Sequence, residues 1–156
     1  MTLAVMIVSF LLQSQAPAPA ETLIRVCVLP AGDAGAADFR ESAKYLSKTF
    51  ADKKKDLVLT AEEQADVVVT VTDRAVTVPK VAIGLVSPGR IGSPAPGPIR
   101  DLHLTVTLSS GGNVVEITNK NVARESTGGW GAAAADVAKQ VEKWIAEHKK
   151  AILALR

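Results

Sequence analysis

The sequence has one cysteine, two histidines and few aromatic residues, and these shortages exclude several kinds of protein. A single cysteine, Cys27, cannot form an internal disulfide bond, so the fold cannot depend on one. The two histidines stand far apart, without H-x-x-x-H or C-x-x-C spacing, and we therefore predict no metal site. Aromatic residues make up only 4% of the chain. A core of Val, Leu, Ile and Ala is therefore expected.

Neither sign of charge dominates, because 18 basic residues face 16 acidic ones and leave a formal charge of +2. Such a balance does not favour nucleic acid or an anionic membrane as a partner, and we expect neither. The three lysines at 53–55 are predicted to close a helix in solvent, where cations interact favourably with the helix dipole.

The first twenty residues carry no charged side chain, and Leu3–Leu12 is apolar apart from Ser9. Ten helical residues span about 15 Å, which is too short to cross a bilayer core. Ala18-Pro19-Ala20 has the small-x-small pattern that signal peptidases cleave, and Glu21 follows it. We predict that residues 1–20 are a signal peptide, although no Lys or Arg precedes the apolar block; the alternative is a buried amino-terminal strand or helix. The mature protein is then exported, periplasmic or secreted, with no stable membrane span.

The remaining chain, 21–156, is predicted to form a single α+β domain. Alternating apolar residues, many of them valine, indicate strands at 22–30, 56–60, 65–78, 80–86, 102–109 and 114–124. Helical spacing indicates helices at 38–55, opened by Asp38 as a cap, and from about Gly131 to Leu155. A single helical turn, capped by Thr60, is expected between the second and third strands.

The predicted order is therefore β-α-β-β-β-β-β-α. It indicates a mixed sheet of about five to six strands with two helices on one face. The first strand is apolar on both sides and should lie inside the sheet. His103, Thr105, Thr107 and Ser109 alternate with leucines and valine, so the other face of the sheet should be partly exposed.

One segment, 87–100, contains four prolines and three glycines and has no helical or strand period. Proline removes backbone donors and glycine adds freedom, so a mobile loop between two strands is predicted. Long loops in compact domains often serve function. Arg90 and Arg100 could hold a carboxylate or phosphate, and they are candidate partner contacts.

Gly128-Gly129-Trp130-Gly131 joins a strand to the last helix, as phosphate-binding loops do. It lacks the lysine of a Walker loop and the G-x-G-x-x-G spacing of dinucleotide sites, so we predict no nucleotide and no other cofactor. Trp130 is expected to pack the helix onto the sheet; the alternative is an exposed partner contact. His148 is expected to be a hydrogen-bonded core residue rather than a ligand. No G-x-S-x-G elbow is present, and we assign no catalytic residue.

Two short motifs are similar to a known pattern. Val28-Leu29-Pro30 closes a strand before a helix, and Ala65-Asp66 opens a strand two elements later. Over roughly residues 23–78 the chain resembles small bacterial envelope domains, namely the amino-terminal domain of the Tol-system β-propeller protein and the related fold of the curli-secretion lipoprotein. The resemblance implies a domain that binds other proteins or assembles, without catalytic residues.

These observations predict an exported, non-enzymatic domain that binds a protein, such as an envelope protein, or another cell-envelope component. Two alternatives stay open. The protein could be a small hydrolase or a small-ligand carrier, in either case with its site under the 87–100 loop.

Overall fold

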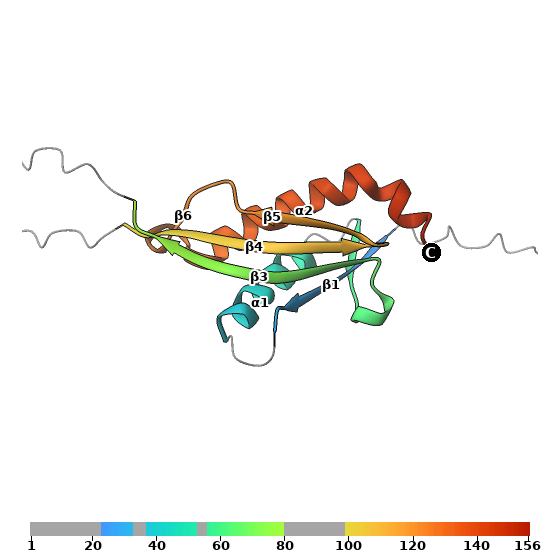
Figure 1. Cartoon of the computed structure of the whole chain (residues 1–156), viewed down its shortest axis with the longest axis horizontal. Helices are drawn as coiled ribbons and strands as arrows, with labels where there is room; N and C mark the ends of the chain where they lie inside the picture. Colours follow the sequence, from blue (N-terminus) through green and yellow to red (C-terminus); the bar gives the residue numbers. More distant parts are fainter. Residues whose placement is uncertain (1–22, 33–36, 53–55, 80–98) are drawn as a thin grey trace, which may run out of the picture.

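The computed structural model describes residues 23–32, 37–52, 56–79 and 99–156 (Figure 1). Its elements follow the predicted order β-α-β-β-β-β-β-α, which confirms the α+β class. They are β1 (Ile24–Pro30), α1 (Ala37–Asp52), β2 (Leu57–Leu59), the 3₁₀ turn η1 (Glu62–Gln64), β3 (Val67–Thr77), β4 (Asp101–Ser110), β5 (Asn113–Thr118), β6 (Ala123–Arg124), the 3₁₀ turn η2 (Glu125–Thr127) and α2 (Gly129–Leu153).

The sheet is mixed, as predicted, and its strand order is β2-β1-β3-β4-β5, with the short β6 paired to β4. Strand β1 runs parallel to both of its neighbours, β2 and β3. The other pairs, β3–β4, β4–β5 and β4–β6, are antiparallel. The two-sided apolar pattern of β1 therefore reflects its place inside the sheet.

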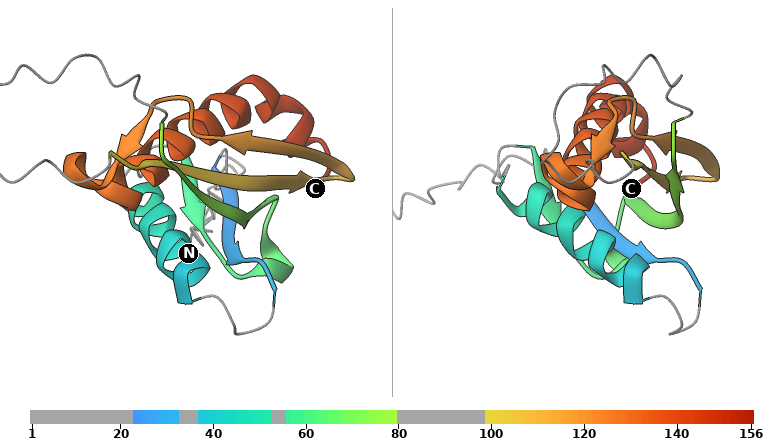
Figure 2. Two further views of the ribbon diagram at one scale, coloured as in Figure 1. Left: turned by 60° about the vertical axis from the view of Figure 1, so that its left-hand side comes forward. Right: turned by 90° about the vertical axis from the view of Figure 1, so that its left-hand side faces the viewer.

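Both helices cover the same face of the sheet and contact each other (Figure 2). The core between them is built from small aliphatic side chains, and Phe50 on α1 is its largest fully buried member. On the sheet its fully buried members are Ile24, Val26, Val67, Val69, Val71, Leu102, Leu104, Val106 and Leu108. The expected core of Val, Leu, Ile and Ala is confirmed.

The other face of the sheet is mostly polar and partly exposed, as the β4 pattern predicts. Threonines from neighbouring strands lie side by side there, and the Oγ1 atoms of Thr105 and Thr118 are 2.8 Å apart. Cys27 belongs to this face through its pairing with Val68, but only 6% of its surface is exposed. The Cys27 thiol is therefore packed within the fold and not open to solvent.

A β-bulge interrupts β3 between Val71 and Asp73. Before it, Val71 pairs with Val106 on the helix-covered face; after it, Arg74 pairs with Leu104 on that same face. The extra residue, Thr72, therefore reverses the alternation of side chains along the second half of the strand.

Several predicted boundaries are wrong in detail. Asp38 lies inside the first turn of α1 rather than at its cap, because the helix begins at Ala37. The turn η1 starts after Ala61 without a side-chain cap; Thr60 instead bonds the Gln64 side chain through its Oγ1 atom at 3.2 Å.

The predicted strand 114–124 is two strands, because the chain leaves the ladder after β5. Helix α2 begins two residues before the expected Gly131 and ends at Leu153.

The predicted signal peptide, the strand at 80–86 and all of the 87–100 loop except its last two residues lie outside the described residues. No helix in the described ranges is long and apolar enough to cross a membrane.

Candidate functional site

Of the three candidate contact residues, Arg100 and Trp130 are described, whereas Arg90 lies outside the described residues. Arg100 directly precedes β4 and is exposed. Its Nη1 atom lies 3.7 Å from Oε1 of Glu125 in η2. Because both side chains are more than half exposed, this ion pair contributes little to stability.

Trp130 lies in the first turn of α2, partly buried against the core. The guanidinium carbon of Arg74 sits 3.9 Å from the centre of its ring, in a cation–π contact. Arg74 also approaches Oε2 of Glu41 at 3.3 Å and donates to the carbonyl oxygen of Asp38. These contacts join α2, β3 and α1, which matches the stapling role favoured from the sequence. A contact of Trp130 with a partner stays a prediction.

Strand β3 ends and β4 begins at the end of the sheet that also carries β6 (Figure 1). Four residues in or next to these strands have exposed apolar side chains. We call them the distal patch; they are Val76 (50% exposed), Val78 (58%), Ile99 (44%) and Val122 (55%). Val76 pairs with Leu102, and Leu102 pairs with Ala123, the residue after Val122. Arg100 lies between Ile99 and β4. The patch has no signal in the sequence, because Val76 and Val78 follow the pattern of ordinary strand residues.

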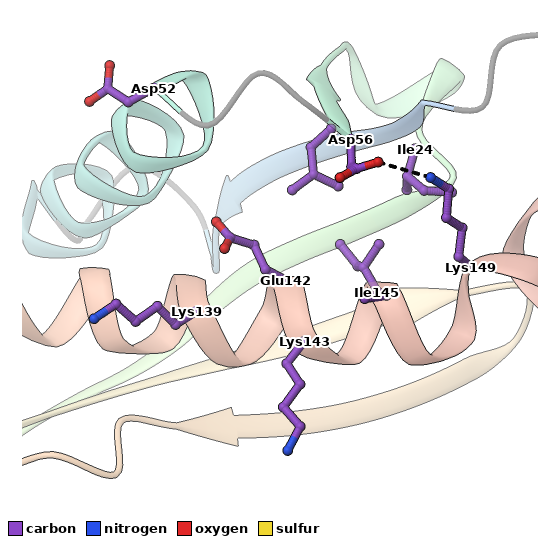
Figure 3. A pocket seen from close by; sticks show the side chains of 10 residues that line it. Ile24, Asp52, Asp56, Lys139, Glu142, Lys143, Ile145 and Lys149 are labelled. Carbon is purple, nitrogen blue, oxygen red and sulfur yellow. Dashed lines mark hydrogen bonds and ion pairs between the residues drawn. The ribbon is translucent and has the colours of Figure 1, made fainter.

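A cavity of about 800 Å³ lies between α1, β2 and α2 (Figure 3). Its apolar lining comes from Ile24, Leu57, Ile145 and Ala146, and its charged lining from Asp52, Asp56, Lys139, Glu142, Lys143 and Lys149. Nζ of Lys149 bonds Oδ1 of Asp56 at 3.1 Å across one end. The charged groups have both signs, so the cavity has no strong preference for an anion or a cation. Neither Arg100 nor Trp130 lines it.

A smaller cavity of about 330 Å³ adjoins a charged cluster centred on Asp66, whose side chain is 4% exposed. Nη2 of Arg25 lies 2.9 Å from Oδ1 of Asp66, and Nη2 of Arg156 lies 2.7 Å from Oδ2. The backbone N–H of Arg25 also donates to Oδ2, at 2.7 Å. Burial by itself raises the pKa of Asp66, but the bonds from Arg156 and Arg25 outweigh it and hold this pKa far below its usual value. The cluster ties β1, β3 and the end of α2 together.

Asp136 on α2 anchors the connection between β5 and β6. Its Oδ2 atom accepts the backbone N–H groups of Lys120 at 2.7 Å and Asn121 at 3.2 Å, and the amide of Gln140 at 3.2 Å. Burial raises the pKa of Asp136, but these hydrogen bonds outweigh the effect and lower it. Both carboxylates with a lowered pKa thus hold elements of the fold together.

His148 is exposed rather than part of the core. Its ring stacks on Trp144 with the centroids 4.5 Å apart, and Nδ1 lies 2.8 Å from the carbonyl oxygen of Trp144. The expectation of a hydrogen bond is met, but the expectation of a core position is wrong. Across the described ranges, no three side chains of His, Cys, Asp or Glu are grouped as a metal ion requires.

No protein-family model and no curated protein matches the chain. Among solved structures, the chain is similar to a PelC dodecamer from Paraburkholderia phytofirmans, with a TM-score of 0.42 and 19% sequence identity. The similarity covers 79% of this chain and 89% of that one. A likeness at this level carries no argument about function, and the resemblance to the Tol and curli envelope domains stays a prediction.

Proposed function

We propose that the chain is an exported binding domain that contacts a protein or another component of the cell envelope through the distal patch. The observation that carries this proposal is the exposure of Val76, Val78, Ile99 and Val122 at one end of the sheet, at 44–58% each. Single exposed apolar residues are ordinary on a protein surface, but a group of them indicates a contact surface.

Burial of the distal patch would contribute measurably to the affinity for a partner. Burying one Val or Ile side chain completely stabilises by about 1.5–3 kcal/mol, so the exposed half of each leaves roughly 1 kcal/mol to be gained. Four such side chains together give about 4 kcal/mol, or roughly a thousandfold in affinity. Arg100 can turn from Glu125 to a carboxylate of a partner at low cost, because the ion pair is exposed.

The test places a photo-crosslinking amino acid at Val78, and at Val58 as the control. Val58 is 41% exposed but belongs to β2, at the other side of the sheet. We expect adducts with one protein or glycan of the envelope fraction from position 78 and none from position 58. The adduct partner is then purified, and its binding to Val76→Ser/Val78→Ser should be at least tenfold weaker than to the unchanged protein. Equal crosslinking at both positions, or equal affinity, would rule out the distal patch.

A small-ligand carrier is a second candidate, and the cavity between α1, β2 and α2 favours it. Its volume of about 800 Å³ is in the range of small-molecule sites, and part of its lining is apolar. The site would then lie in this cavity rather than under the 87–100 loop. Ala146 is exposed at its rim, so Ala146→Trp fills the cavity without disturbing the core. Loss of an apolar fluorescent dye from this variant, with an unchanged melting temperature, would support the carrier.

A further inference from the structure

Strand β5 is an edge of the sheet, paired only with β4 among the described residues. Ser110 and Asn113 close the hairpin across a two-residue turn, Gly111-Gly112, in which both φ angles are positive (53° and 84°). In such a turn the closing pair exchanges both of its backbone hydrogen bonds, and every second pair along the ladder does the same.

This alternation fixes which backbone groups of β5 point away from the sheet. Val115 and Ile117 bond β4, whereas Val114, Glu116 and Thr118 direct their N–H and C=O groups outward. Two hydrogen bonds confirm the alternation. Asn119 N–H donates inward to Leu104 at 3.2 Å, and the outward carbonyl oxygen of Thr118 accepts from the Gln140 side chain of α2 at 3.0 Å.

The outward groups of Val114 and Glu116 bond no described residue. Helix α2 contacts β4 more than β5, and its one hydrogen bond to this edge is at Thr118. Natural sheets block such edges with charged side chains, proline or a bulge. Strand β5 has no proline and no bulge, its one charged side chain is Glu116, and its Val114 side chain is 67% exposed. The edge is therefore a template for one more strand.

We propose that the added strand is β5 of a second copy of this chain, antiparallel, with Val114 opposite Glu116 of the second copy. The two-fold axis passes between the two Val115 residues. Val114 N–H then donates to the carbonyl oxygen of Glu116 of the second copy, and Glu116 N–H donates to the carbonyl oxygen of Val114 of the second copy. Symmetry doubles these bonds, so the outward N–H and C=O groups of Val114 and Glu116 are paired in each copy.

The outward backbone groups of β5 are complementary to those of an identical strand. This complementarity favours a second copy of the chain as the partner and one register of pairing. A register centred on Glu116 would place two carboxylates directly opposite each other and would need the Thr118 carbonyl, which already accepts from Gln140. A register centred on Val114 would set Glu116 opposite Gly112, which lies in the turn and not in an extended strand. The register centred on Val115 pairs the outward groups of Val114 and Glu116 and avoids opposed like charges.

The first test compares two charges at one position by sedimentation of the purified protein over a range of concentrations. In Val114→Lys each new ammonium group faces Glu116 of the second copy, whereas in Val114→Glu each new carboxylate faces it. Both variants lose the same exposed valine. Since two such pairs form per dimer, we expect Val114→Lys to dimerise at least tenfold more tightly than Val114→Glu. A protein that stays monomeric throughout, or equal dimerisation of the two variants, would overturn the proposal.

The second test reports the register. Residues opposite each other in a bonded antiparallel pair have Cα atoms about 5.5 Å apart, which suits a disulfide bond. A mixture of Val114→Cys and Glu116→Cys proteins should therefore oxidise to the mixed dimer, and neither protein alone should do so readily. Cys27 is buried and gives little background. Faster crosslinking of either variant alone would show a different register and refute this one.

A third variant tests whether dimerisation needs the outward backbone N–H of Glu116. Glu116→Pro removes an outward N–H that the fold does not use, so it should keep the melting temperature within a few degrees and abolish dimerisation. Glu116→Pro leaves the distal patch unchanged. Loss of dimerisation and loss of partner binding at the distal patch can therefore be measured separately. Pairing of β5 with an extended segment of another protein, in place of a second copy, would also overturn the proposal.

Discussion

Replacing Asp66 by Asn should remove much of the stability of the domain at neutral pH. The carboxylate of Asp66 receives Arg25 and Arg156 side chains and the backbone N–H of Arg25, all within 3.3 Å. An asparagine keeps the shape but loses the charge, and its amide nitrogen would turn a second donor toward the guanidinium groups. The two arginines would then be left beside a neutral side chain.

The magnitude follows from the burial of the three groups. Removing one partner of a buried ion pair costs about 3–5 kcal/mol. Here Asp66 is 4% exposed, but Arg25 and Arg156 are 36% and 25% exposed and recover part of their hydration. We therefore expect Asp66→Asn to lower the free energy of unfolding by about 2–3 kcal/mol, which for a domain of this size lowers the melting temperature by roughly 8 °C.

The pH dependence gives a sharper test than the stability loss alone. The pKa of Asp66 in the folded protein is depressed, so its contribution is complete above the unfolded pKa of about 3.9 and is lost as the pH falls toward the folded pKa. Urea unfolding of both proteins at pH 7, 5, 4, 3 and 2 should show a full difference at pH 5–7 that shrinks below pH 4.

Asp73→Asn is the control, because Asp73 is exposed on β3 beyond the bulge. This variant should cost less than about 0.5 kcal/mol, as surface substitutions usually do. If the loss in Asp66→Asn is as large at pH 2 as at pH 7, the charge of the carboxylate is not its source, and the reasoning fails.

Three further predictions concern other parts of the chain. Burial, then two nearby glutamates, raise the pKa of the Cys27 thiol, so a thiol reagent at pH 7 should label the native protein far more slowly than the urea-unfolded one. Arg74→Ala removes the cation–π contact with Trp130 and the ion pair to α1, and should cost about 1–2 kcal/mol in urea unfolding, whereas a loss below 0.3 kcal/mol would contradict the stapling role. Protein recovered from an envelope or culture fraction should begin at Glu21 by intact mass, whereas full-length chain there would contradict the signal peptide.

Local patterns were enough to predict most elements of the fold. The alternation of Leu102, Leu104, Val106 and Leu108 predicts both β4 and its buried face, because side chains alternate along every strand. The apolar residues on both sides of β1 predict an interior strand for the same reason. The partners of each strand were beyond this reasoning, since pairing depends on residues far apart in the chain.

The break between β5 and β6 shows such a long-range cause. The side chain of Asn119 accepts from the backbone N–H of Leu104 at 2.6 Å and donates to the carbonyl oxygen of Leu102 at 3.1 Å. These side-chain bonds take the place of the next backbone hydrogen bonds between β4 and β5, so the chain can leave the sheet after β5. The sequence shows only an asparagine within an alternating stretch, where nothing local identifies its partners.

The candidate site was harder to predict than the fold. From the sequence Val76 looks like an ordinary strand residue, and the structure places it on the helix-covered face, opposite Leu102. It is nevertheless half exposed, because exposure depends on how far the helices extend over the sheet. Arg100 lies next to the distal patch and is a cation beside a proline-rich segment. This position is a signal that the sequence shows, whereas the apolar residues of the patch have none.

The bulge in β3 connects the register of the sheet to this end of the molecule. Without the bulge, Thr72 would take a regular place in the ladder, and the alternation that buries Val71 would turn Asp73 toward the helices and Arg74 toward the open face. Arg74 could then reach neither Trp130 nor α1, and a carboxylate would lie against the apolar core. The same reversal places Val76 on the face next to the first turn of α2. The bulge therefore determines both the contact that holds α2 and the face on which Val76, one member of the distal patch, lies.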